Sequence, residues 1–154
     1  MNNSEVKSAL QDLIIRLQDA EKGYKEVEKA TSIVPLQKWM NRYAKERHAY
    51  HKELEAHVAL LGGDADVKTS FLGDLHRMFI DVKISNTNWA NEFEAIVTEI
   101  ERGSNRLIAE YDKVLEEVKL SATLAKTLFV QKEAISREVA EMIRMKEEVS
   151  TVEA

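Results

Sequence analysis

Residues 89–118 read WANEFEAIVTEIERGSNRLIAEYDKVLEEV, with apolar or aromatic side chains at steps of three or four throughout. This spacing puts those side chains on one face of an α-helix, so the segment predicts a long amphipathic helix. About thirty helical residues would extend over roughly 45 Å. A helix of that length with a single apolar face needs other helices to cover that face.

The same spacing occurs twice before this segment. It predicts one helix from an N-cap at Ser4 to about residue 30, and a second helix from Pro35 to the Gly62–Gly63 pair. Proline suits the first turn of a helix, and glycine suits the position just past its end. The short turn between the two helices predicts a tight helical hairpin.

Two further segments complete the pattern. Residues 67–83 form a shorter amphipathic segment that ends in a polar stretch at 85–88, and a weak break at 119–121 precedes a last helix. Two long hairpins joined by a long connection with its own short helix is the layout of ferritin-like four-helix bundles. We therefore expect an all-α fold, with one domain over residues 1–149 and a frayed tail over residues 150–154.

Composition narrows the class of function. The 154 residues include five Gly, one Pro and no Cys, which favours helices and excludes disulfides and thiolate metal sites. The net charge is −5, with 22 basic and 27 acidic residues mixed along the chain, so we expect no nucleic-acid partner. No stretch approaches the ~20 apolar residues of a membrane span, and the N-terminus has no leader pattern. A cytoplasmic location without a membrane partner is the expectation.

Acidic residues interrupt the apolar faces of the helices. Glu21 follows the first apolar stripe. In a helical hairpin, residues equally far along the chain from the turn lie opposite each other, so with the turn at 32–33 Glu21 lies close to Glu46 in the second helix. By the same counting from the break at 119–120, Glu101 lies opposite Glu138 in the last helix. One carboxylate from each helix, all near one level, is the skeleton of a di-metal carboxylate site for iron or manganese.

This skeleton lacks its imidazole ligands. Such sites use a Glu-x-x-His step on two helices, but Ala49 and Glu141 stand where those histidines belong. The favoured interpretation is a structural polar layer without a cofactor, in which the glutamates pair with Arg47, Arg102 or tyrosine hydroxyls. Iron or manganese binding by Glu21, Glu46, Glu101 and Glu138 is the alternative.

Two other features have competing interpretations. His48 and His51, with Glu55 four residues later, could clamp a divalent metal at the surface, but they lie one step off the apolar stripe, so solvated side chains are expected. Gly23 and Gly103 lie inside predicted helices, where glycine is costly, and therefore suggest a close approach at both places.

Six short motifs occur in order along the first three quarters of the chain: DAEKGY at 19–24, YAKER at 43–47, LGG at 61–63, GDLHR at 73–77, DVK at 81–83 and EIERG at 99–103. Together they resemble a bacterial family of ferritin-like four-helix-bundle proteins catalogued as domain of unknown function 2383. The resemblance implies a ferritin-like bundle with no established activity. Ser104 and Asn105 replace acidic residues of the family pattern, and no His lies near Ala140, so a metal role is weakened.

Three hypotheses about function follow. The first is a non-enzymatic helical bundle that self-associates, most simply as a homo-oligomer, around a structural polar layer. The alternative is a carboxylate-ligated di-metal protein or an oxidoreductase of the ferritin-like class. A third is a module that binds another protein. The missing Glu-x-x-His steps favour the first hypothesis over the second.

Overall fold

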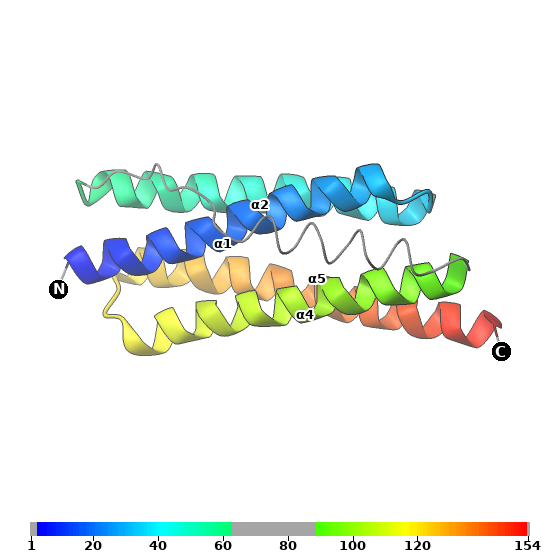
Figure 1. The fold of residues 1–154 in the computed structure, drawn as a ribbon. Coiled ribbons are helices and arrows are strands. Elements are labelled where there is room, and N and C mark those ends of the chain that lie inside the picture. The colour runs from blue at the N-terminus through cyan, green and yellow to red at the C-terminus, as the bar shows by residue number, and fades with distance from the viewer. Residues whose placement is uncertain (1–2, 63–88, 154) are drawn as a thin grey trace.

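The computed structural model describes residues 3–62 and 89–153 (Figure 1). Four helices account for 93% of these residues, and no strand occurs among them. They are α1 (Asn3–Ala30), α2 (Val34–Leu60), α4 (Trp89–Glu117) and α5 (Ala122–Glu153). The predicted all-α four-helix bundle is confirmed, whereas the short helix expected at 67–83 lies outside the described residues.

The helix boundaries follow the expected signals closely. α1 begins at Asn3, one residue before the expected cap, and α5 continues to Glu153, past the expected domain boundary at residue 149. Gly62 has a φ of +78°, the left-handed conformation that glycine adopts just past a helix end. The predicted end of α2 is therefore confirmed.

Two helical hairpins form the bundle, with α1 against α2 and α4 against α5 (Figure 1). The first turn is closed by Thr31, whose hydroxyl accepts a hydrogen bond from the Ile33 amide at 3.1 Å. Pro35 lies in the first turn of α2, as expected. In the second hairpin the Ser121 hydroxyl accepts a hydrogen bond from the Leu124 amide at 3.2 Å and so caps α5.

The hydrophobic core consists of two clusters at opposite ends of the bundle. One contains Leu10, Leu17, Leu54, Leu107 and Leu128, and the other contains Val27, Met40, Phe93, Ile100 and Met142. Between the two clusters every helix contributes a buried polar residue, and together we call these residues the polar layer. They are Glu21 from α1, Arg47 and His51 from α2, Ser104 from α4 and Glu138 from α5.

Arg47 is the fully buried centre of the polar layer, with 0% of its surface exposed. One guanidinium nitrogen donates to Glu138 Oε2 at 2.7 Å and lies 3.5 Å from the Tyr24 hydroxyl. The Tyr24 hydroxyl is in turn 3.4 Å from Ser104 Oγ. The expected pairing of a core glutamate with Arg47 is therefore confirmed, and the contacts join all four helices.

Two expectations about this region are wrong. Arg102 does not enter the polar layer, because its exposed side chain pairs with Glu99 one turn earlier on α4. Gly103 is exposed, and a Cβ built there would meet nothing within 4 Å, so no close approach explains that glycine. Gly23, by contrast, is buried, and the close approach expected there stays a prediction.

We predict that Glu138→Leu destabilises the fold by about 3–5 kcal/mol, because it leaves the Arg47 guanidinium buried without a counter-charge. Urea unfolding followed by circular dichroism measures the change. Replacing both partners, as Arg47→Met with Glu138→Leu, should restore most of the loss. The control is Glu141→Leu on the same helix. The partly exposed Glu141 side chain pairs with Arg42 at 3.3 Å, and its loss should lower the free energy of unfolding by less than about 1 kcal/mol. Equal losses for the two single variants would contradict the central role of the buried pair.

Candidate functional site

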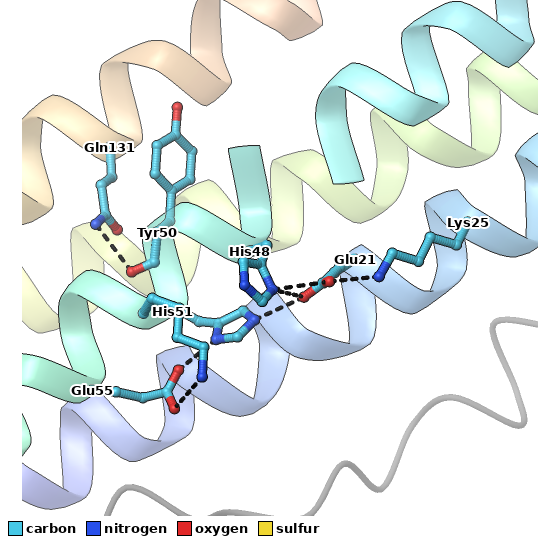
Figure 2. A network of polar contacts seen from close by, with 8 residues as sticks. Glu21, Lys25, His48, Tyr50, His51, Glu55 and Gln131 are labelled. Carbon is cyan, nitrogen blue, oxygen red and sulfur yellow. Dashed lines mark hydrogen bonds and ion pairs between the residues drawn. The ribbon is translucent and has the colours of Figure 1, made fainter. Parts of the chain in front are cut away.

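A cluster of polar side chains joins α1 to α2 at one edge of the polar layer (Figure 2). Glu21 is only 8% exposed, and its Oε1 lies 2.7 Å from His51 Nε2. Its Oε2 lies 3.1 Å from His48 Nδ1 and 2.8 Å from Lys25 Nζ. One buried carboxylate therefore contacts two imidazoles and an ammonium group.

The helices position these groups in a simple way. His48 and His51 are three residues apart on α2, so both rings lie on one face of that helix. Helical side chains lean toward the N-terminus of their own helix, and α1 and α2 run in opposite directions. The tips of Glu21 and the two histidines consequently meet, although the backbones of His48 and His51 lie about one and two turns beyond the position opposite Glu21.

His51 is the residue on which the geometry of the cluster depends. It is 4% exposed, and its Nδ1 lies 2.6 Å from Glu55 Oε2 while its Nε2 faces Glu21. A neutral imidazole has one N–H and can donate to only one of these carboxylates. Both contacts are satisfied together only by a further proton, on the ring or on a carboxylate, or by a cation between the ring and a carboxylate.

Three donor atoms can converge on one ion here. Glu21, His48 and His51 each offer one atom within 4.8 Å of the other two, and this is the only such group in the described helices and turns. Ligands bound to one ion at ~2.0–2.2 Å lie about 3–3.5 Å apart, so small side-chain movements would suffice. The His48 side chain is 52% exposed, which leaves the cluster open to solvent on one side.

Glu21 is the anionic member of the cluster. Burial alone would raise the pKa of Glu21, but hydrogen bonds from Lys25, His51 and His48 outweigh burial and hold the pKa below its usual value. The carboxylate is therefore ionised at neutral pH. An ionised carboxylate beside two imidazoles is a suitable ligand set for a divalent transition metal.

The other predicted site residues lie elsewhere in the bundle. Glu46 is partly exposed, 3.8 Å from Arg42 and 4.0 Å from Arg47, and Glu101 pairs with Lys146 at 3.3 Å. Glu138 pairs with Arg47. Of the four carboxylates predicted to meet, only Glu21 lies beside histidines, and we call Glu21, His48 and His51 the ligand cluster.

The histidines are where the sequence prediction was weakest. His51 is buried, so the expectation of solvated side chains is wrong for it and correct for His48. The signal present in the sequence was the His48–His51 step followed by Glu55, which holds the inner ring. Its partner Glu21 lies on another helix, and the position predicted to lie opposite Glu21 was residue 44, about two turns short of His51.

The fold and the cluster define a class: an all-α four-helix bundle with a buried polar layer and a carboxylate–imidazole cluster at its edge. The family described as "Domain of unknown function (DUF2383)" matches residues 5–117, which include α2, α4 and all but the first two residues of α1. The chain belongs to this family, as the order of its motifs predicted. No curated protein and no solved structure matches it. None of the described helices is long and apolar enough to cross a membrane.

We predict that the Glu21 carboxylate makes the stability of the fold depend on pH under acid conditions. Because its pKa is lower in the folded chain than the usual 4.5, the stability it contributes is complete above that pH and is lost as the pH falls through the folded-state value. The gap in unfolding free energy between wild type and Glu21→Gln should narrow between about pH 5 and pH 3. Glu5→Gln, at an exposed position of the same helix, is the control. A gap that stays constant down to about pH 3 would contradict the assignment.

Proposed function

We propose that this protein binds one divalent transition-metal ion through Glu21, His48 and His51. The observation that carries the proposal is the position of His51, whose two ring nitrogens both face carboxylates at 2.6 and 2.7 Å. A metal ion between Nε2 and Glu21 would bind both groups without a second proton on the ring. The ring could then stay neutral, as a metal ligand requires.

Glu55 supports this assignment. Metal-bound histidines generally donate their other ring N–H to a carboxylate, which fixes the orientation of the ring and strengthens it as a ligand. Glu55 stands in that relation to His51, one helical turn further along α2. His51 thus combines a ring nitrogen directed at Glu21 with a carboxylate behind it.

The ligand types favour some ions over others. Two imidazole nitrogens and one carboxylate oxygen suit Zn²⁺, Fe²⁺, Co²⁺ or Mn²⁺, whereas Ca²⁺ and Mg²⁺ favour ligand sets made of oxygen. A single ion is proposed rather than the di-metal centre of the alternative hypothesis, because Arg47 already supplies a permanent cation to Glu138. Three protein ligands and an exposed His48 leave coordination positions for water or another small ligand.

We predict that Zn²⁺ or Mn²⁺ raises the melting temperature of protein prepared without chelators. An ion at about a hundred times its Kd stabilises by about 2.7 kcal/mol, which for a chain of this size is roughly 5–10 °C. His48→Ala should weaken the affinity at least tenfold, in the order of magnitude expected for loss of a metal-site group. Its ring is half exposed, so the fold should tolerate the change.

His57→Ala is the matched control, since His57 lies on the same helix but outside the ligand cluster. Glu55→Gln should weaken binding by about 10–100-fold without removing a ligand. Calorimetric titration gives the affinities. The proposal fails if the wild type shows no saturable binding, or if His48→Ala and His57→Ala bind alike.

We also propose that the chain self-associates. Trp89 at the start of α4 and Phe129 and Val130 on α5 are each at least half exposed, which leaves apolar side chains uncovered by the rest of the bundle. Light scattering should give a mass above the 17.6 kDa of one chain, and Phe129→Glu should lower it. A monomer mass at high protein concentration would contradict self-association.

A further inference from the structure

Lys25 contacts the same carboxylate that the proposed metal would use. Its Nζ lies 2.8 Å from Glu21 Oε2, one helical turn along α1, and Figure 2 shows it approaching Glu21 from the side opposite His51. The Lys25 side chain is 54% exposed. Among the described residues, Glu21 is the only acidic group with which it forms an ion pair in the structure.

We infer that Lys25 is a built-in competitor of the metal ion: its ammonium group neutralises Glu21 in the ion-free site and leaves the carboxylate when the ion binds. This inference rests on the proposed function. It assigns to Lys25 the role of setting the metal affinity rather than that of a ligand, because a protonated amine has no lone pair to donate.

The geometry gives the reason for displacement. Oε2 lies within hydrogen-bond distance of both Lys25 Nζ and His48 Nδ1, so an ion bound between Glu21 and His48 would lie only a few ångströms from the ammonium group. Two positive charges at that separation repel each other appreciably even beside water. The half-exposed lysine stem can rotate outward at little cost, whereas the buried Glu21 and His51 cannot.

The Lys25 charge also provides a way to change the metal affinity of the site. The positive charges near Glu21 are Lys25 on α1 and, when protonated, His48 and His51 on α2. Only Lys25 carries a charge that a metal ligand set does not need. Any change that removes this charge, including acetylation of the exposed amine, should therefore tighten metal binding.

The test compares Zn²⁺ affinity in four full-length proteins: wild type, Lys25→Gln, Lys25→Arg and Lys29→Gln. Lys25→Gln should bind Zn²⁺ about five- to tenfold more tightly than wild type at low ionic strength, and the gain should shrink as salt screens the lost repulsion. Lys25→Arg keeps the charge and should bind no more tightly than wild type. Lys29→Gln, one turn further along α1 at an exposed position, should change the affinity less than twofold.

The outcomes separate this inference from the proposal on which it rests. If the wild type binds Zn²⁺ but Lys25→Gln binds no more tightly than Lys29→Gln, the competition is overturned while the metal site stands. Weaker binding by Lys25→Gln would overturn it too, because it would make Lys25 a support of the ligand set. If none of the four proteins binds Zn²⁺, both the site and the competition are overturned.

Discussion

The burial of the Arg47 guanidinium is the constraint around which the bundle is organised. A charge without access to water is tolerated only beside an opposite charge and hydrogen-bond acceptors. Glu138, on the opposite hairpin, supplies that charge, with its Oε2 2.7 Å from an Arg47 guanidinium nitrogen. Tyr24 on α1 adds a hydroxyl. The pair fixes how the two hairpins pack, because sliding one hairpin by a turn would separate the Arg47 and Glu138 charges while both stayed buried. It also divides the hydrophobic core into two clusters, with the polar layer between them.

The same constraint limits the proposed metal site to the edge of the polar layer. At the centre, the positive charge is part of the chain and cannot leave. At the edge, Glu21 faces two imidazoles and a lysine, whose protons or charge can be exchanged for an ion from solvent. A dinuclear centre would need the other three carboxylates free of their basic partners. These pairs are Glu46 with Arg42, Glu101 with Lys146 and Glu138 with Arg47. The layer thus combines a permanent internal salt bridge with a site that is open on one side.

Much of the fold could be predicted because helical spacing, Pro35 and Gly62 are local signals that act within a few residues. The presence of acid at mid-height was also predictable, since Glu21 and Glu138 interrupt apolar stripes. The ligand cluster was not, for two physical reasons. A residue one step off a stripe can be buried or solvated depending on the neighbouring helix, as His51 and His48 show. In addition, each side chain leans toward the N-terminus of its own helix, so in this antiparallel pair Glu21 meets residues one to two turns beyond the position directly opposite its backbone.

The most direct measurement for the central claim is anomalous diffraction from crystals of the chelator-free protein grown with Zn²⁺, recorded on both sides of the zinc absorption edge. If Glu21, His48 and His51 bind one ion, we expect one strong anomalous peak at the α1–α2 edge of the polar layer, about 2.0–2.2 Å from Glu21, His48 Nδ1 and His51 Nε2. Lys25 Nζ should then lie away from Glu21. A peak between Glu46, Glu101 and Glu138, or no peak beside Glu21 at saturating Zn²⁺, would contradict the account.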